Sequence, residues 1–351
     1  MKNRVSIGAI ILIFVVIAYY FYINSSFQIF SPSVGDKSTP EVFPSISIDS
    51  IFSDNHSWVA TLSAKNTITI IATGDIIPAR TVNYKAVATN NFSWPYEKVA
   101  DFTNNADLTF ANLEAPQIKD CPVTTEGMVF CGDKRNINGL VYAGVDLVSL
   151  ANNHAGNHGE QGVTDTINNL KDAGIGVTGI SGPFVKEIKG VRFAFLGYND
   201  ISKDQPGVSD VIEDRMREEI RDAKNLSDVV IVTFHWGVEY RSLPDERQVY
   251  LGHLAIDSGA DLVIGNHPHW IQPVEIYKGK LITYAHGNFV FDQMWSQKTT
   301  EGVLGKYVFY GKDLIDVEYF PLKIFDFGQA RFMDEVEKQK ILDEMKQNSE
   351  M

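Results

Sequence analysis

The chain has few cysteines and no excess of positive charge. Two cysteines in 351 residues exclude a cysteine-stapled scaffold and a thiolate zinc site. A formal net charge of −13 argues against nucleic acid as a partner, because binding phosphates requires clustered Lys and Arg. A hydrophobic fraction of 44% is nevertheless enough for a substantial core. The chain is therefore expected to be a folded protein of one large or two ordinary domains.

The N-terminus carries the longest apolar stretch. Lys2 and Arg4 precede an uncharged segment whose most apolar part is Val5 to Ile23. A bilayer-spanning helix needs about 20 apolar residues, and a basic flank stays in the cytoplasm. We predict a cytoplasmic stub at 1–4 and a transmembrane signal anchor at 5–23, which places the rest outside the cytoplasm as a single-pass cell-membrane protein. A cleaved signal peptide is the alternative, but the run is long for one and no small-x-small cleavage site follows.

The remaining chain divides by composition into three parts. Residues 24–66 are rich in Ser and contain three prolines, which predicts a flexible tether, although the apolar patch Ile46 to Ile51 could dock on the domain. In residues 67–328, short β-branched runs alternate with helical patterns, such as Ile212, Met216, Ile220 and Ala223 on one face. This alternation predicts one layered α/β domain. Residues 329–351 form a charged C-terminal tail, which is expected to end in a solvated helix.

Polar residues able to bind a metal follow six of the apolar runs. Ligands of open α/β sheets bind beyond the carboxyl ends of the strands, so these residues are expected to converge in one crevice. They are Asp75, Asn112, Glu114, Asn152, Asn153, His154, His235, Asn266, His267, His269, His286 and Asn288.

The donor types within this set suit a transition metal. Imidazole, carboxylate and amide oxygen together favour Zn, Fe or Mn, whereas Ca²⁺ prefers oxygen ligands alone. In His267-Pro268-His269 the two imidazoles would share a side of an extended backbone. The candidate ligands exceed the needs of one ion, which suggests two metals about 3.5–4 Å apart. The alternative is that these histidines merely form hydrogen bonds in a loop. The six ligands proposed are Asp75, Glu114, Asn153, His235, His267 and His269.

Six segments, ordered along the chain, form one pattern: Gly74-Asp75, Ala111 to Glu114, Leu150 to His154, His235-Trp236-Gly237 with Glu239-Tyr240, Gly265 to His269, and Gly287 to Asp292. Together they resemble CapA-type capsule biosynthesis proteins, a family associated with bacterial poly-γ-glutamate synthesis and export. The resemblance runs from about Ile68 to about Gly302. It implies a place among the calcineurin-like metallophosphoesterases, with two facing β-sheets flanked by helices in a four-layer αββα sandwich.

The resemblance also implies roles for these residues. Asp75 and His269 would hold a first ion, and Asn153, His235 and His267 a second. Glu114 would be the bridging carboxylate, where the phosphoesterases usually have aspartate. His154 would be the general acid for the leaving group, with water activated by the metals as the nucleophile.

Two departures from the family pattern concern the site. Ile77 stands where metallophosphoesterases commonly have a ligand histidine, so the first ion lacks one candidate ligand, which water or Asn112 would replace. In Asn157-His158-Gly159, many relatives have aspartate before the glycine. His158 could supply an imidazole there, although a surface histidine at a helix start is the simpler interpretation.

Other residues are expected to support the site. Glu239 and Asp292 are candidates for orienting ligand histidines through the free ring N–H, and His286 for support from behind. Asn112, Asn152 and Asn288 complete this supporting or substrate-contacting set. Cys121 and Cys131 would form a disulfide in an oxidising exterior, with free thiols as the alternative.

The sequence leaves two functional hypotheses open. The first is a metal-dependent hydrolase of a phosphoester or amide in an envelope polymer. The second is a non-catalytic scaffold whose metal pocket is a relic and which binds an anionic polymer, such as poly-γ-glutamate, during synthesis or export. Membrane synthase subunits are expected partners in either case.

Overall fold

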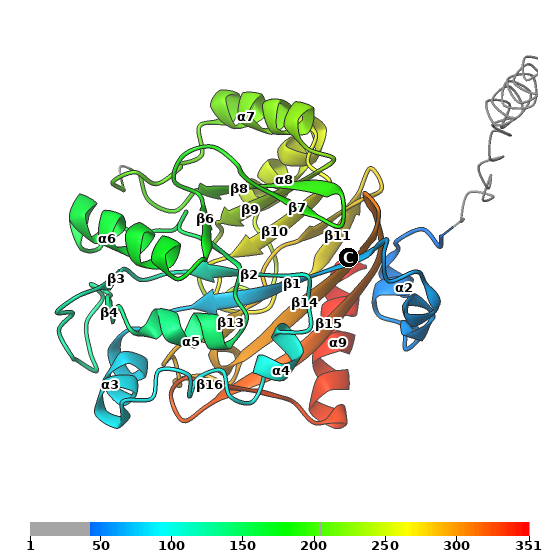
Figure 1. Ribbon diagram of the computed structural model, residues 1–351. Helices are drawn as coiled ribbons and strands as arrows, with labels where there is room; N and C mark the ends of the chain where they lie inside the picture. Colours follow the sequence, from blue (N-terminus) through cyan, green and yellow to red (C-terminus); the bar gives the residue numbers. More distant parts are fainter. Residues whose placement is uncertain (1–42, 204, 351) are drawn as a thin grey trace, which may run out of the picture. The chain divides into compact units, whose positions relative to one another are not determined.

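The computed structural model describes residues 43–203 and 205–350, and residues 44–351 form one compact unit. Its first sheet has eight strands in the order β16-β15-β14-β1-β2-β5-β6, with β13 also paired to β1 (Figure 1). β1, β2, β5 and β6 are parallel, and β14 to β16 are antiparallel. The bounds are β1 Thr67–Ile76, β2 Leu108–Leu113, β5 Leu147–Ser149, β6 Gly176–Thr178, β13 Asn288–Val290, β14 Glu301–Tyr310, β15 Asp313–Phe325 and β16 Gln329–Phe332.

The second sheet has six strands in the order β11-β12-β10-β9-β8-β7. Its four central strands, β12, β10, β9 and β8, are parallel, and the edge strands β7 and β11 are antiparallel to their neighbours. The bounds are β7 Phe184–Ile188, β8 Val191–Asn199, β9 Val229–His235, β10 Leu262–Asn266, β11 Val274–Tyr277 and β12 Lys280–Thr283. A short parallel pair, β3 (Gln117–Ile118) and β4 (Gly132–Asp133), lies apart from both sheets.

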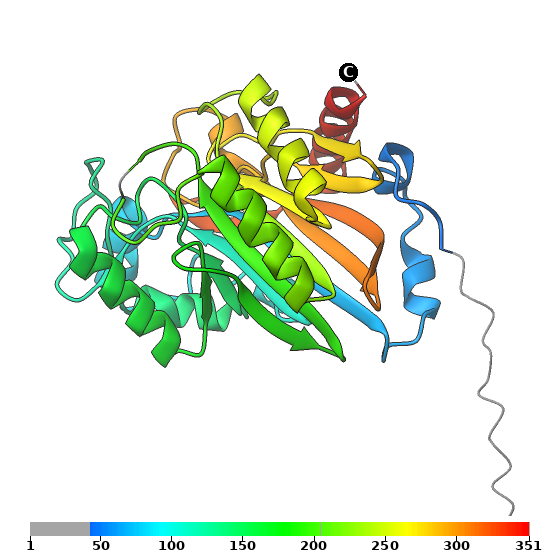
Figure 2. The same ribbon diagram turned by 90° about the horizontal axis from the view of Figure 1, so that it is seen from above.

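The two sheets face each other across a shared apolar core, because successive strand side chains point to opposite faces. Ile70 of β1 and Phe193 of β8 belong to the cluster between the sheets. Their neighbours Ile71 and Ala194 point outward, into clusters covered by helices. The first sheet is covered by α3 (Arg80–Thr89), α4 (Ala100–Thr103), α5 (Asn136–Tyr142) and α6 (Gly159–Asp172), and the second by α7 (Glu213–Leu226) and α8 (Glu246–Ser258). Figure 2 shows α7 and α8 over the second sheet. The predicted α/β architecture of two facing sheets flanked by helices is observed.

The folded unit is wider than the predicted domain of residues 67–328. Before it, α2 (Ile48–Ile51) packs against the domain, with Ile51 buried in the core between the sheets, and the 3-10 helix η1 (Ser57–Thr61) follows. The part of the predicted tether described here, residues 44–66, is therefore docked. The docking follows from the apolar spacing of Ile46, Ile48 and Ile51, which the Ser-rich composition outweighed in the prediction.

The predicted charged tail is also part of the fold. Residues 329–332 form β16, and α9 (Glu335–Ser349) packs on the core through Ile341 and Met345. These two residues are four positions apart, so they lie on one face of a helix whose other positions are mostly charged or polar. The Lys346 ammonium is 2.7 Å from the Asp49 carboxylate, which ties α9 to α2.

Within residues 43–203 and 205–350, no helix is long and apolar enough to cross a membrane. The predicted stub at 1–4 and anchor at 5–23 lie outside the described residues, as does the tether up to residue 42.

His56 fastens the docked N-terminal segment to β15. Its Nδ1 is 2.8 Å from the Asp316 carboxylate, and both side chains are nearly buried. The hydrogen bond to Asp316 raises the pKa of His56, against the opposing effect of burial, and Glu318 adds to the increase. This interaction stabilises the fold fully below the unfolded pKa, about 6.5. It is lost as the pH rises through the higher folded pKa.

We therefore expect His56→Gln to lower the free energy of unfolding most at pH values below about 6.5. The difference from wild type should shrink as the pH rises above the folded pKa of His56. Urea unfolding across this range measures it. A difference that grows with pH would contradict the assignment.

Candidate metal centre

The predicted ligands lie at the carboxyl ends of parallel strands from both sheets. Asp75 is the last residue but one of β1, and Glu114 directly follows β2. His235 ends β9, and His267 directly follows β10. Strand register brings Asp75 opposite Asn112 and Asn288, and Asn266 opposite His235. The pairing of strands thus brings Asp75 beside Asn288, which lies 213 positions further along the chain (288 − 75), in one cluster.

Asp75 and His269 meet on one side of this cluster. The Asp75 carboxylate is 3.2 Å from His269 Nδ1 and accepts a hydrogen bond from the backbone N–H of His267 at 3.2 Å. Asn112 donates its side-chain amide to the other Asp75 oxygen at 2.8 Å. His269 Nδ1 also lies 2.9 Å from the Asn288 side-chain oxygen.

Asn153, His235 and His267 meet on the other side. His235 Nε2 is 2.8 Å from the Asn153 side-chain oxygen and 3.1 Å from His267 Nδ1. The rings of His267 and His269 are 5.8 Å apart, so the two groups are adjacent.

Glu114 lies between these two groups and is fully buried. Neither carboxylate oxygen has a hydrogen-bond partner among the described residues. His235 Nε2 lies 3.4 Å and His154 Nε2 lies 4.0 Å from Glu114 Oε1. One donor atom each from Glu114, His267 and His269 lies within 4.8 Å of the others, and the same holds for Asp75, Glu114 and His235. A buried carboxylate without hydrogen bonds is costly, and a cation held by these groups would compensate it. The residues present therefore fit a divalent metal.

The ionisation of the cluster agrees with this fit. Burial alone would raise the pKa of Glu114, but the imidazoles of His235, His269 and His154 hold it at about 2. Burial and the neighbouring rings of His235 and His269 lower the pKa of His267 well below its usual value, which keeps that ring neutral. Burial also lowers the pKa of His269, but Asp75 and Glu114 raise it to about 9. An anionic carboxylate and a neutral imidazole are the forms that bind metals, so Glu114 and His267 are in the binding form, whereas His269 would release its proton when a metal binds.

The backbone around Pro268 is not extended, contrary to the prediction. His267 has φ 99° and His269 has φ 56°, positive backbone angles that residues other than glycine rarely adopt. The two imidazoles therefore converge through a tight turn rather than through strand alternation. Such strain is retained where the surrounding structure over-determines it, often at functional sites.

Comparison with known proteins identifies the family of the chain. The model of a family described as bacterial capsule synthesis protein PGA_cap matches residues 69–293. The chain belongs to this family. Capsule biosynthesis protein CapA of Bacillus anthracis is 29% identical over 297 residues, covering 78% of this chain and 72% of that protein. PGA biosynthesis protein CapA of Bacillus subtilis is 29% identical over 286 residues, covering 77% and 75%. A probable polyglutamine synthesis accessory protein of Mycobacterium tuberculosis is 30% identical, covering 63% and 66%.

Among solved structures, a novel phosphatase from Mycoplasma pneumoniae has a TM-score of 0.48 at 16% identity, covering 74% of this chain and 94% of that chain. A 5′-nucleotidase from Candida albicans has a TM-score of 0.43 at 12% identity, covering 86% and 55%.

The asparagines of this PGA_cap family member support the ligands as a hydrogen-bonded network. Asn152 donates to the Asn112 side-chain oxygen at 3.2 Å and to the Leu113 carbonyl at 2.9 Å. Asn112 in turn holds Asp75 and lies 3.3 Å from His235 Nδ1. Asn288 donates to the Thr299 carbonyl at 2.9 Å while it faces His269. Ligands on separate strands are thereby held in one arrangement.

Asp292 has a different partner from the one predicted. Its carboxylate forms an ion pair with Arg80 and accepts the backbone N–H of Thr81 at 3.0 Å. Asp292 was expected to orient a ligand histidine, but its carboxylate bonds to Arg80 and Thr81, and His269 is held by Asn288 and Asp75. Glu239 contributes an electrostatic increase to the pKa of His269.

His286, His158 and Ile77 were also singled out by the sequence, and none of them is in either group of donor atoms. His286 is fully buried, with Nε2 3.0 Å from the Tyr307 hydroxyl, and burial lowers its pKa to about 4. His158 is the residue before α6, as the helix-start interpretation expects. Ile77 packs in a small apolar cluster with Phe130 and Phe291, so that position holds apolar contacts in place of a ligand.

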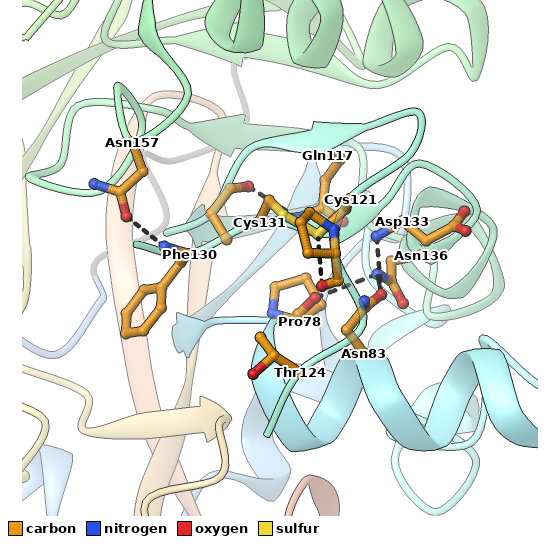
Figure 3. The surroundings of a disulfide bond; sticks show 12 residues. Pro78, Asn83, Gln117, Cys121, Thr124, Phe130, Cys131, Asp133, Asn136 and Asn157 are labelled. Carbon is orange, nitrogen blue, oxygen red and sulfur yellow. Dashed lines mark hydrogen bonds between the residues drawn. A yellow bond between two sulfur atoms is a disulfide. The ribbon is translucent and has the colours of Figure 1, made fainter. Parts of the chain in front are cut away.

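The loop closed by Cys121 and Cys131 borders the site and was not predicted to do so. The two cysteines form a disulfide, shown in Figure 3. Phe130, next to Cys131, contacts His154 with ring centroids 4.2 Å apart and ring planes tilted by 30°. Arg80 lies 5.0 Å above the Phe130 ring and 4.9 Å above Phe291. The sequence offered one signal that this loop borders the site, the aromatic Phe130 beside Cys131 in the segment after Glu114. The contact of Phe130 with His154, however, depends on the fold.

Proposed function

We propose that this chain is a metal-dependent hydrolase of an envelope polymer that acts in capsule or poly-γ-glutamate synthesis or export. Its family and the names of its relatives, which concern capsule, PGA and polyglutamine synthesis, support the proposal. The substrate bond would be a phosphoester or an amide.

The buried Glu114 carboxylate is the observation that carries the metal dependence. It lies among three imidazoles and Asp75 without a hydrogen-bond donor among the described residues. Packing alone does not explain an ionised side chain in this position, because a buried carboxylate without hydrogen-bond donors destabilises a fold unless a cation compensates it.

We propose that the cluster binds one or two ions of Mn, Fe or Zn. Asp75 and His269 would hold the first ion, Asn153, His235 and His267 the second, and Glu114 both. Bound metal would supply Lewis-acid polarisation and an activated water nucleophile. His154, whose Nε2 is directed toward Glu114 at 4.0 Å, would exchange a proton with the reacting groups.

One observation favours the second candidate, a non-catalytic scaffold that binds an anionic polymer. Ile77 is fully buried among apolar side chains at the place of a usual ligand, so the first ion has fewer protein ligands. With a net charge of −13, binding an anionic polymer would need the local positive charge of a cation.

The proposal also includes a location. We propose that residues 5–23 anchor the chain in the cell membrane with the folded unit outside the cytoplasm. The disulfide between Cys121 and Cys131 supports an oxidising compartment.

Hydrolysis by the full-length chain separates the two candidates. With added Mn²⁺, wild type is expected to cleave bis(p-nitrophenyl) phosphate or poly-γ-glutamate, and His154→Gln to lower kcat by about 100-fold or more. Metal content should stay unchanged in this variant. The control is His253→Gln, because His253 stacks on Tyr277 outside the cluster. Tight polymer binding by the metal-loaded chain without cleavage of either substrate would refute the hydrolase and support the scaffold.

A further inference from the structure

Asn157 and the disulfide-closed loop both contact His154. His154 Nδ1 is 2.9 Å from the Asn157 side-chain oxygen. The same oxygen accepts the backbone N–H of Phe130 at 2.6 Å, the contact drawn as a dashed line in Figure 3. His154 therefore shares its hydrogen-bond partner with the loop that ends at Cys131.

The Phe130 contact determines which end of the Asn157 amide faces His154. A backbone N–H can only donate, so the shared atom must be the carbonyl oxygen of the side chain and not its NH₂ group. A carbonyl oxygen has two lone pairs and only accepts. The nitrogen that His154 directs at it, Nδ1, must therefore carry a proton.

We propose that Asn157 and the Phe130 N–H select the tautomer of His154, with the proton on Nδ1 and a free lone pair on Nε2. Nε2 is the nitrogen that faces Glu114 across 4.0 Å. In its neutral form His154 thus accepts a proton or a hydrogen bond at the metal cluster, and it must gain a proton on Nε2 before it can give one to a leaving group. Asn157 is a positioning residue in this arrangement, whose catalytic meaning rests on the proposed function.

The disulfide loop holds the donor in place. Phe130 is 2% exposed, whereas Met128 and Val129 before it are 63% and 68% exposed, so the loop returns to the core at Phe130. Cys131 is then joined to Cys121, and the Gly132 N–H donates to the Pro116 carbonyl at 2.8 Å. The Phe130 ring, tilted by 30° against the His154 ring, restricts rotation of the imidazole. Asn157 and the disulfide-closed loop, neither of which is among the assigned metal ligands, thus set the position of the proton on His154.

The test is nitrogen-15 NMR of the histidine rings in the full-length chain, treated with chelator and kept at about pH 8, where an ordinary imidazole is neutral. The His154 signals are assigned by their loss in His154→Gln. Wild type is expected to show protonated Nδ1 and unprotonated Nε2. A wild-type ring protonated on Nε2 would overturn the proposal. The measurement needs no enzymatic activity, so the proposed hydrolase can fail without affecting its result.

Three variants separate positioning from a structural role. Asn157→Leu removes the acceptor and is expected to abolish the tautomer preference, giving signals averaged between the two forms. Asn157→Asp keeps an acceptor for both donors and is expected to retain the wild-type pattern. Phe130→Leu keeps the backbone N–H and should also retain it. If Asn157→Leu left the wild-type tautomer unchanged, Asn157 would not be its determinant.

Discussion

Exchanging Glu114 for glutamine is expected to weaken the binding of Mn²⁺ or Zn²⁺ by at least about 100-fold, since even residues that only support metal ligands account for 10–100-fold. Glutamine has nearly the same shape but no negative charge, and its NH₂ group cannot coordinate a cation. Glu114 contributes to both groups of donor atoms that lie within 4.8 Å of one another, so both halves of the cluster should be affected. Isothermal titration calorimetry of the full-length chain measures the affinity.

The matched control is Glu239→Gln. Glu239 is partly exposed and acts on His269 through its charge. Its substitution should change metal affinity much less than that of Glu114. The chelated Glu114→Gln protein should remain folded, because the variant removes a buried charge without hydrogen-bond partners. Equal affinities of wild type and Glu114→Gln would contradict the assignment of Glu114 as a ligand.

Gly74→Ala is expected to destabilise the chain by about 3 kcal/mol or more, because overpacking against rigid backbone has the largest cost. A Cβ at this position would lie 2.1 Å from the carbonyl oxygen and 2.9 Å from the carbonyl carbon of Gly287. The Asp75 N–H donates to that same oxygen at 3.0 Å. Relief of the clash must separate β1 from β13, which moves Asp75 relative to Asn288. The variant should therefore lose metal affinity as well as stability.

Gly311→Ala is the control for this substitution. Gly311 lies in the turn between β14 and β15 with φ 58°, and no heavy atom lies within 4 Å of an added Cβ. Its cost should be about 1 kcal/mol, from the backbone conformation alone. Denaturant unfolding of both variants measures the difference. Similar losses for the two would show that close approach at Gly74 does not matter.

Much of the fold could be predicted from the sequence because its signals are local. Each buried run that became a parallel strand carries its polar residue at the carboxyl end, so Asp75, Glu114 and His235 were identified without knowledge of strand order. The face of α7 formed by Met216, Ile220 and Ala223 was likewise evident from spacing.

What could not be predicted depends on distant partners. Asp292 pairs with Arg80, which lies 212 positions away. The place of Asp292 in a family motif therefore did not reveal its partner. The turn at His267 is held by the Asp75 carboxylate, which overrides the extended conformation that local sequence suggests. In α9, two buried residues among many charges decide the docking, and such a narrow apolar stripe differs little from that of a solvated helix.

The metal content of the purified full-length chain is the most direct test of the central claim, that these strand ends form a metal site. After incubation with Mn²⁺, Fe²⁺ or Zn²⁺ and removal of free ions, mass spectrometry of the elements should find about one or two transition-metal ions per chain. The double variant His235→Ala, His267→Ala, folded by circular dichroism, should hold almost none. A wild-type chain without bound metal under these conditions, or a double variant that retains the full content, would contradict the account.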